Sequence, residues 1–286
     1  MEIIKNYRHN ESLRRSFNAL AEKTFGLNFE NWYQNGFWGD NYNPYSVVMD
    51  GEVVANVSLN RTNLLVNGEA KRVYQLGTVM TDEAYRNRGL IRAIMAEIEK
   101  DTADGDGVYL FANDEVVDFY PKFGFTRGTE FICTREVKQD TACTMKPIPM
   151  DSPAQWAILD KAIASSRFAE GCRMVDNPGL IFFYVSQFMQ DCVYFCEELD
   201  AYVIAEVEDG NLLIHNIFSG ADVSLDAVIR AFGSEIHTVT LGFTPADTDG
   251  FTVSDHHEED STFFVKGSFF REFSENSMRI PSLSHA

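Results

Sequence analysis

The apolar residues of the N-terminal half alternate between helical and strand-like spacing. Residues 12–25 show one apolar face at helical spacing, and residues 29–36 predict a second, short helix that ends before Asn43-Pro44. Asp50-Gly51 and Asn67-Gly68 then each separate two apolar runs, which is the pattern of a tight hairpin. The sequence therefore predicts a four-stranded antiparallel meander after the two helices. Its strands are predicted at 45–49, 53–59, 64–66 and 71–81.

A helix and two further strands are predicted after the meander. Residues 88–102 carry a single apolar stripe, which predicts an amphipathic helix. Residues 108–112 predict a short strand, 114–120 a short helix closed by Pro121, and 131–137 another strand. A strand–helix–strand crossover after a meander gives a sheet with both parallel and antiparallel pairs. The predicted fold class is therefore α/β, with α+β character and a mixed sheet.

The second half repeats this order of elements. Residues 139–153 are polar, contain two prolines and predict a linker. The helices predicted after it are 152–166, 179–189 and 225–232, and the strands are 192–197, 201–208, 212–218, 238–243 and 262–266. We therefore predict two copies of one architecture, with a first domain at 1–140 and a second at 150–286.

Composition and charge exclude several classes of protein. The 286 residues carry a formal net charge of −19, and 23 of them are Phe, so a large folded core is expected and general disorder is not. Such an acidic chain is not expected to bind nucleic acid through phosphate contacts. It is compatible with a cationic or amine-bearing ligand, although acidity also serves solubility alone.

The cysteines and the N-terminal residues indicate a reduced, cytoplasmic protein. The odd number of cysteines and their spacing predict neither a disulfide framework nor a metal site, but small buried thiols. They are Cys133, Cys143, Cys172, Cys192 and Cys196. No apolar leader is visible, and no apolar run has the length of a membrane span, so no membrane association is predicted.

A basic loop on this acidic chain is the strongest chemical signal. Residues 86–91 read Arg-Asn-Arg-Gly-Leu-Ile, follow a predicted strand and open a predicted helix. Gly89 lets an anion approach the backbone, and the free N–H groups of residues 88–92 would point toward it. Arg86, Arg88 and Arg92 could add charged contacts. The alternative is a plain turn with a capping glycine.

The loop does not stand alone, because two blocks together resemble one family. Arg86-x-x-Gly89-x-Ile91 is similar to the acyl-coenzyme A loop of the GCN5-related N-acetyltransferase (GNAT) superfamily, apart from Ile91 at a Gly/Ala position. Residues 110–113, Leu-Phe-Ala-Asn, and 119–125, Phe-Tyr-Pro-Lys-Phe-Gly-Phe, resemble the block that follows it in that family. The longer string 85–92 and the tandem layout are most similar to the branch of the enhanced-intracellular-survival acetyltransferases.

The resemblance implies a fold, a cosubstrate and a set of site residues. The fold would be a pair of GNAT-like domains, the second without the coenzyme A loop, and the cosubstrate would be acetyl-CoA without a metal. Val79 and Thr81 would hold the pantetheine arm through their amides, Asn113 would hydrogen-bond it, and Tyr120 would protonate the departing thiolate. The alternative for Tyr120 is a core aromatic. The complete set implied for binding is Val79, Met80, Thr81, Arg86, Asn87, Arg88, Gly89, Leu90, Ile91, Arg92 and Asn113.

The general base is not visible in the sequence. An amine with a pKa of about 10.4 is protonated at pH 7, so some group must remove a proton. Asp40, Glu83 and Glu130 are candidates, but each is expected to be a solvated acid. In the branch that the sequence resembles, a C-terminal carboxylate carries out this task.

Three further features have competing interpretations. Trp38 is the best aromatic candidate for a wall of the acceptor pocket, while Trp32 and its neighbours are expected to pack in the core. His256 and His257 lie among acidic residues and are expected in a solvated loop rather than at a metal. Cys133 would allow an acyl-cysteine route if it lay near the thioester, but burial as a small apolar residue is the preferred interpretation.

The sequence therefore predicts an enzyme that transfers an acetyl group from acetyl-CoA directly to a primary amine. The acceptor would be a small molecule or a peptide amine, and the acidic surface suits a cationic one. The second domain would shape the acceptor site or form an interface between copies of the chain. The main alternative is a non-catalytic protein that binds coenzyme A or a partner.

Overall fold

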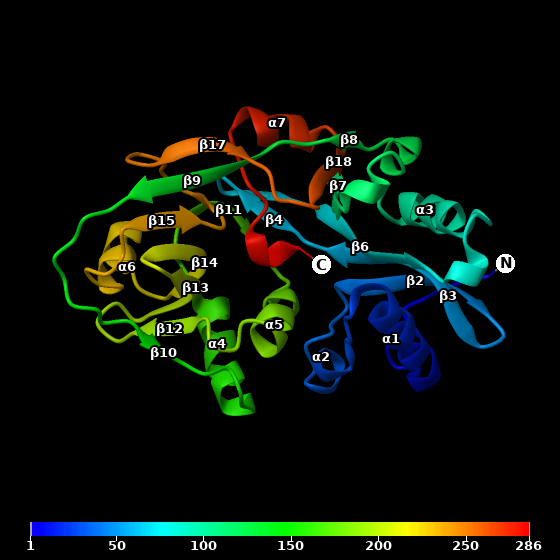
Figure 1. The fold of residues 1–286 in the computed structure, drawn as a ribbon, viewed down its shortest axis with the longest axis horizontal. Coiled ribbons are helices and arrows are strands. Elements are labelled where there is room, and N and C mark those ends of the chain that lie inside the picture. The colour runs from blue at the N-terminus through cyan, green and yellow to red at the C-terminus, as the bar shows by residue number, and fades with distance from the viewer. Residues whose placement is uncertain (1, 286) are drawn as a thin grey trace.

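The computed structural model describes residues 2–285, which form two seven-stranded sheets and one four-stranded sheet with helices packed around them (Figure 1). The helices are α1 (Glu11–Phe25), α2 (Glu30–Gln34), α3 (Leu90–Asp101), α4 (Pro153–Ser165), α5 (Pro178–Gln187), α6 (Leu225–Ala231) and α7 (Phe269–Glu275). In this part of the chain, no helix is long and apolar enough to cross a membrane.

The first sheet carries the predicted crossover. Its strands, in spatial order, are β1 (Ile3–Lys5), β2 (Tyr42–Met49), β3 (Glu52–Arg61), β6 (Val73–Thr81), β7 (Gly107–Ala112), β18 (Thr262–Lys266) and β8 (Thr126–Arg127). β2, β3 and β6 are antiparallel, and α3 then leads to β7, which is parallel to β6. This arrangement confirms the predicted mixed sheet.

The second sheet has the same topology. Its strands, in spatial order, are β10 (Lys146–Pro147), β12 (Val193–Cys196), β13 (Ala201–Glu208), β14 (Asn211–Ser219), β15 (Thr238–Leu241), β9 (Glu130–Glu136) and β17 (Thr252–His256). An antiparallel meander again leads through one helix, α6, to a parallel strand, β15. The repeated architecture that the order of elements predicted is therefore present, and the fold class is confirmed.

The two sheets exchange one strand each. β8 and β9 are neighbours in sequence, but β9 lies between β15 and β17 in the second sheet. In return β18, which follows β17, lies between β7 and β8 in the first sheet. The boundary predicted at residues 140–150 consequently does not separate the sheets, and a division into domains with separate roles stays a prediction.

A third, smaller sheet joins the halves and corrects the predicted meander. The hairpin β4 (Leu64–Val66) and β5 (Glu69–Lys71) leaves the first sheet and pairs with β11 (Glu170–Met174), which in turn pairs with β16 (Thr244–Pro245). The antiparallel run of the first sheet therefore skips this hairpin. The apolar side chains of β4 and β11 pack against α7 in one hydrophobic cluster. The hairpin therefore covers this cluster instead of extending the first sheet.

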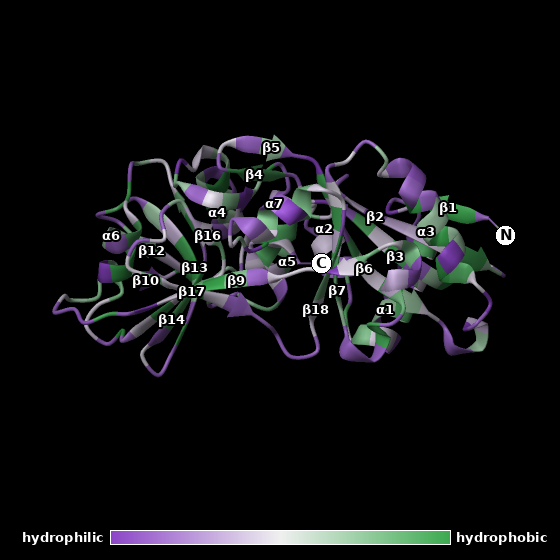
Figure 2. Ribbon diagram, turned by 90° about the horizontal axis from the view of Figure 1, so that it is seen from above, coloured by the Kyte–Doolittle hydropathy of each residue, from purple (hydrophilic) through white to green (hydrophobic). Residues whose placement is uncertain are grey.

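Apolar stretches concentrate in the strands and in the inner faces of the helices, while the connecting loops are polar (Figure 2). α3 covers the first sheet over one cluster, and α6 covers the second sheet over another. The segment 139–153, predicted to be a linker, instead lies along the second sheet. Its residues form β10, and Gln139 Nε2 donates to two carbonyl oxygens around α6.

Candidate active site

β6 and β7 separate halfway along β6. Their parallel pairing covers Val73–Leu76 of β6, which then continues to Thr81 beside β3 alone. The Asp82 N–H donates to the Val54 carbonyl of β3, so the alternation of a strand turns the N–H groups of Thr81 and Val79 toward the side that β7 has left. These N–H groups therefore point toward the cavity that Val79 and Thr81 line between the separated strands.

A bulge in β6 marks the point of separation. Thr78 has a φ of 48°, and the register between β3 and β6 shifts there by one residue. The buried Asn56 of β3 donates through Nδ2 to the Thr78 carbonyl at 2.9 Å and accepts at Oδ1 from Ser46 Oγ at 2.8 Å. The Tyr42 hydroxyl lies 2.6 Å from Thr78 Oγ1 on the other side. Polar side chains, among them the buried Asn56, thus hold the bulge at the wall of the cavity.

Replacing Asn56 with Ala is expected to lower the free energy of unfolding by about 1–3 kcal/mol, because the Thr78 carbonyl and the Ser46 hydroxyl lose buried partners. Urea unfolding measures the change, and Asn31→Ala on the exposed face of α2 is the control. Amide exchange should accelerate at Asp82, whose N–H donates to the Val54 carbonyl across the β3–β6 pair. A variant as stable as the wild type would contradict this role for Asn56.

The loop after β6 ends at an uncapped helix N-terminus. Asn87 and Gly89 have φ values of 61° and 74°, and Gly89 is the N-cap residue of α3. No side chain caps α3, and its first turn contains no acidic residue. A Cβ placed on Gly89 would meet no atom within 4 Å, so the space in front of the helix is open. Free N–H groups and the helix dipole make this end of α3 suited to an anion.

The corresponding end of α6 in the second sheet has the opposite character. Ser224 caps it by accepting a hydrogen bond from the Ala227 N–H, and Asp226 lies in its first turn. Because Ser224 already accepts a hydrogen bond from this helix end and Asp226 would repel a negative charge, the N-terminus of α6 does not favour an anion. The prediction that only the first repeat carries an anion loop is consistent with this contrast.

The three arginines of the loop lie around the uncapped end of α3. The Arg88 guanidinium donates to the Ala84 carbonyl at 2.7 Å and lies over the Tyr85 ring, which fixes it to the loop. Arg86 lies 3.9 Å from the Glu83 carboxylate, and both side chains are exposed. Arg92 makes no ion pair or hydrogen bond within residues 2–285. Arg86 and Arg92 are therefore available to a ligand at little cost in broken contacts, and Arg88 is held beside the helix end.

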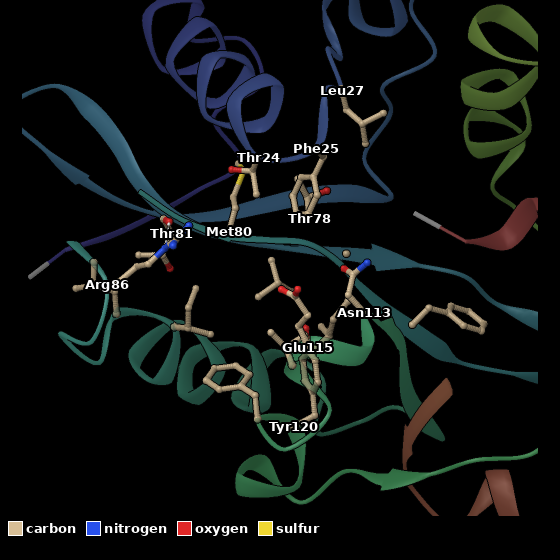
Figure 3. Close-up of a pocket in the computed structure, with 18 of the residues that line it drawn as sticks. Thr24, Phe25, Leu27, Thr78, Met80, Thr81, Arg86, Asn113, Glu115 and Tyr120 are labelled. Atoms are coloured by element: carbon tan, nitrogen blue, oxygen red, sulfur yellow. Dashed lines mark hydrogen bonds between the residues drawn. The ribbon is translucent and has the colours of Figure 1, made fainter. Parts of the chain in front are cut away.

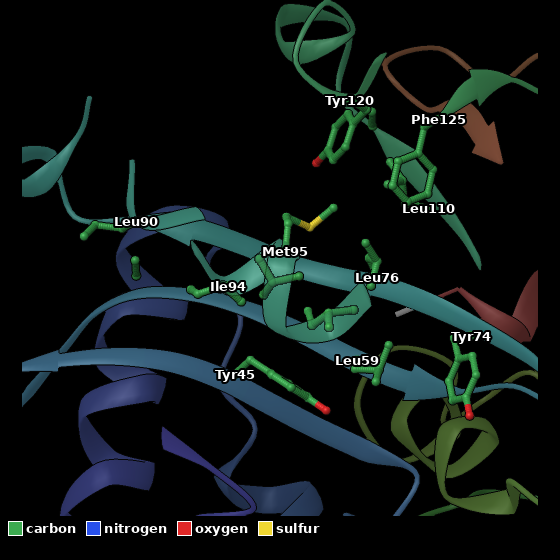
Figure 4. Close-up of a cluster of buried hydrophobic side chains, with 14 of the residues drawn as sticks. Tyr45, Leu59, Tyr74, Leu76, Leu90, Ile94, Met95, Leu110, Tyr120 and Phe125 are labelled. Carbon is green, nitrogen blue, oxygen red and sulfur yellow. The ribbon is translucent and has the colours of Figure 1, made fainter. Parts of the chain in front are cut away.

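Tyr120 lies opposite β6, at the edge of the core cluster under α3 (Figure 4). Its ring contacts Phe125 and Phe264, and the side chain is only 5% exposed. Burial raises the pKa of Tyr120 to about 12. Its hydroxyl makes no hydrogen bond to any residue that the structure describes. The phenol is thus a protonated donor that lines the cavity.

Asn113 is held by a residue from the other end of the chain. Its Nδ2 donates to Asp260 Oδ2 at 2.8 Å, and the Asp114 N–H donates to Asp260 Oδ1 at 2.7 Å. The hydrogen bond from Asn113 is the main reason that the pKa of Asp260 lies below its usual value. Asp260 reaches this position because β18, which begins two residues later, belongs to the first sheet.

All of the predicted site residues line one cavity of about 1290 Å³ (Figure 3). β6, the basic loop and α3 form one wall, and the segment from Asn113 to Phe123 forms another. A third wall is aromatic and aliphatic and comes from α1, α2 and α5. Its members are Phe25, Leu27, Phe29, Trp32, Leu180 and Phe183. The structure therefore brings together side chains that lie more than 100 residues apart.

The structure corrects the aromatic and histidine predictions. Trp32 rather than Trp38 lines the cavity; Trp38 is buried, and its Nε1 donates to the Tyr42 carbonyl. His256 is half-buried on β17, where burial lowers its pKa to about 4, so it is not a loop residue in solvent. Within residues 2–285, no group of three His, Cys, Asp or Glu side chains is arranged to hold a metal.

The cysteine predictions are correct in part. Cys133, Cys172 and Cys196 are buried, but Cys143 is exposed, and all of the cysteines are free thiols. Cys133 lies on β9 in the second sheet and does not line the cavity. An acyl-cysteine route through Cys133 therefore has no support in the geometry.

None of the three proposed bases lines the cavity. Asp40 pairs with Arg8, and Glu83 with Arg86. Glu130, predicted to be solvated, is instead buried, and burial raises its pKa to about 7 while the Ile280 N–H donates to it. The C-terminal carboxylate implied by the resemblance stays a prediction, because the structure describes no residue beyond His285.

Sequence reasoning missed the two carboxylates that do line the cavity, Glu115 and Asp260. Glu115 lies inside the second block that carries the resemblance, between its parts 110–113 and 119–125, so its position in the site was visible in principle. Asp260 belongs to an acidic stretch of the second half, and only the strand exchange brings it here.

Comparisons with known proteins agree with this geometry. Residues 8–128 match the family described as acetyltransferase (GNAT) domain. No match was found among curated protein sequences. Among solved structures, a probable N-acyltransferase from Enterococcus faecalis V583 is similar over 95% of this chain and 74% of its own, with a TM-score of 0.62 and 14% identity.

Two further solved structures share the fold. Eis1 from Mycobacterium abscessus is similar over 92% of this chain and 73% of its own, with a TM-score of 0.54 and 13% identity. A GCN5-related N-acetyltransferase from Kribbella flavida is similar over 93% and 72%, with a TM-score of 0.54 and 16% identity. At these identities the likeness shows the fold alone. Residues 8–128 therefore match an acetyltransferase (GNAT) domain, and the chain as a whole shares its fold with these structures.

Proposed function

We propose that the chain is an acetyl-CoA-dependent N-acetyltransferase that acts on a primary amine. The observation that carries this proposal is the joining of two features in one cavity, the uncapped N-terminus of α3 and the separated edge of β6. An anion-binding helix end beside free strand donors suits a long ligand that has a diphosphate and an amide-containing arm. The family match supports the same class of ligand.

The residues present fit coenzyme A by charge and by space. The open position in front of Gly89 and the free N–H groups of residues 89–92 would hold the diphosphate, with Arg86, Arg88 and Arg92 around it. The amides of Val79 and Thr81 would hold the pantetheine arm. Asn113 would add a side-chain hydrogen bond, since its Oδ1 has no partner within residues 2–285 while its Nδ2 donates to Asp260. When bound, acetyl-CoA supplies an acetyl group activated as a thioester.

The chain's own groups would then act on that thioester in two ways. A free N–H of β6, at Val79 or Thr81, would stabilise negative charge that develops on the carbonyl oxygen. Tyr120 would donate its proton to the departing sulfur. Because burial raises the pKa of Tyr120 to about 12, its hydroxyl remains a proton donor throughout the neutral pH range.

The wall of the cavity away from the loop suits an amine acceptor. Phe25, Trp32 and Phe183 provide apolar and aromatic surface, which attracts organic cations, and Glu115 and Asp260 add negative charge. The formal net charge of −19 would also draw a cationic acceptor toward the protein. Since Phe183 and Asp260 come from the second half, that half would help to shape the acceptor site.

Release of free thiol from acetyl-CoA across a panel of amines tests the proposal. Amine-dependent release is expected, with loss of both turnover and acetyl-CoA binding in Gly89→Glu, which places a carboxylate in front of α3. Gly51→Glu is the matched control, because Gly51 has a similar φ of 85° and equal space but lies in the β2–β3 turn. Binding without turnover for any amine would favour the alternative, a non-catalytic protein that binds coenzyme A.

A further inference from the structure

We propose that Glu115 is the general base that removes the first proton from the acceptor's ammonium group. This inference rests on the proposed function, because it names the residue that prepares the amine for attack. Glu115 lies on the 3₁₀ turn Asp114–Val116, which follows β7 and precedes Tyr120. Figure 3 shows Glu115 and Tyr120 projecting into the cavity below β6, both from the stretch of chain that follows β7.

The cavity offers few other proton acceptors. No His, Lys or Cys is among the described residues that line it. Its ionisable side chains besides Glu115 are Tyr42, Tyr85, Arg86, Arg88, Arg92, Tyr120 and Asp260. A guanidinium group is not deprotonated in proteins and accepts no proton, and burial raises the pKa of Tyr42 and Tyr120 to about 12. The choice of base therefore lies between two carboxylates.

The carboxylate of Asp260 is already hydrogen-bonded to other residues of the protein. Both of its carboxylate oxygens accept hydrogen bonds, from Asn113 Nδ2 and from the Asp114 N–H. These contacts hold its pKa below the usual value, which makes it a weak proton acceptor. Protonating Asp260 would also weaken the hydrogen bonds that it accepts from Asn113 and Asp114.

Glu115, in contrast to Asp260, has no partner among the described residues that holds its carboxylate. Its carboxylate makes no hydrogen bond or ion pair within residues 2–285, although basic side chains are plentiful on the other wall of the same cavity. A carboxylate that is free of partners and lines a cavity can approach a ligand without breaking contacts. The backbone beside it is fixed, because Asp260 and Thr262 both bond to Asp114.

The proton balance of the reaction assigns a role to each group. The nitrogen forms a bond to the acetyl carbon, and the carbon–sulfur bond breaks. Of the two protons that the ammonium nitrogen loses, the first goes to Glu115 and then to solvent. Tyr120 protonates the departing sulfur, and the second proton from nitrogen restores the Tyr120 hydroxyl. No further co-reactant is needed.

Glu115→Gln tests the assignment through the basicity of the acceptor. With an amine of pKa about 10, kcat/KM at pH 7 should fall about 100-fold or more, and the loss should shrink as pH rises and the free amine accumulates. With an amine of pKa below about 6, which is neutral at pH 7, the variant should stay within a few-fold of wild type. Asp118→Asn, an exposed neighbour outside the cavity, is the control.

The outcomes separate this inference from the proposed function. An equal loss with both amines would mean that Glu115 only binds the acceptor or supports the loop, and it would overturn the assignment. Activity within threefold of wild type with the basic amine would also overturn it. Calorimetry with coenzyme A should show unchanged affinity for the variant, which confirms an intact fold. If the wild type itself shows no amine-dependent turnover, the proposed function fails instead.

Discussion

Replacing Tyr120 with Phe is expected to lower kcat by about 100- to 1,000-fold while leaving the affinity for coenzyme A unchanged. The hydroxyl has no partner within the described residues, so its removal breaks no contact, and the ring keeps its packing against Phe125 and Phe264. What is lost is the proton donor for the departing sulfur. Steady-state rates of thiol release, together with calorimetry, measure both quantities.

Two controls sharpen this prediction. Tyr33→Phe removes a hydroxyl outside the cavity, where Tyr33 contacts His9, and it should leave kcat unchanged. Because burial raises the pKa of Tyr120 to about 12, its ionisation should cause no loss of wild-type activity between pH 8 and pH 10. If kcat of Tyr120→Phe stayed within threefold of wild type, Tyr120 would be a core aromatic, as the alternative interpretation holds.

A fragment that ends at residue 140 is expected to be unfolded, although it contains every residue of the basic loop. In this fragment the first sheet lacks β18, so β7 and β8 lose the strand between them. β9 meanwhile loses both of its partners, because β15 and β17 belong to the second half. Exposed strand edges and an open apolar face favour aggregation. Circular dichroism and solubility report the outcome.

Co-expression of residues 1–140 with 141–286 provides the matched comparison. The two fragments should purify together as a folded complex that binds acetyl-CoA, because Asp140 and Thr141 are exposed and the cut interrupts neither sheet. A soluble, cooperatively folded 1–140 fragment that binds acetyl-CoA alone would contradict the strand exchange. It would instead support the division at 140–150 that the sequence predicts.

Single helices and strands could be predicted because they depend on residues that are close in sequence. The helix predicted at 12–25 is observed as α1 (Glu11–Phe25), where Asn10 caps its start and Gly26 ends it with a φ of 70°. The strands at 201–208 and 262–266 have the predicted bounds. The segment 114–120, however, forms separate 3₁₀ turns instead of one helix. Periodicity over so short a segment does not distinguish the two.

Partners of strands were not predictable from the same pattern. The alternation along 131–137 indicates a strand but carries no information on which sheet accepts it. The same holds for 64–66, whose hairpin forms a separate sheet with β11. β11 itself was not predicted, since Glu170–Met174 contains few of the residues that favour strands. Non-local pairing therefore accounts for most of the errors in the fold.

The same distinction between local and non-local contacts applies to the residues of the candidate site. Residues near the basic loop follow one another in sequence, so the motif predicted a common wall that includes Arg86, Gly89 and Ile91. Asp260 and Phe183 reach the cavity only through tertiary structure, and no local signal marks them. Trp38 was preferred to Trp32, yet the structure buries Trp38, whose Nε1 donates to the Tyr42 carbonyl. Composition cannot decide which of two nearby aromatics faces a cavity.

A crystal structure of the protein with acetyl-CoA would test the central claim most directly. The diphosphate is expected within hydrogen-bond distance, about 2.7–3.2 Å, of main-chain N–H groups of residues 88–92, with the pantetheine arm between β6 and β7. Arg92, which has no partner in residues 2–285, should turn toward the phosphates. A diphosphate bound at any other surface, or a structure in which the nucleotide is absent at saturating concentration, would contradict the account.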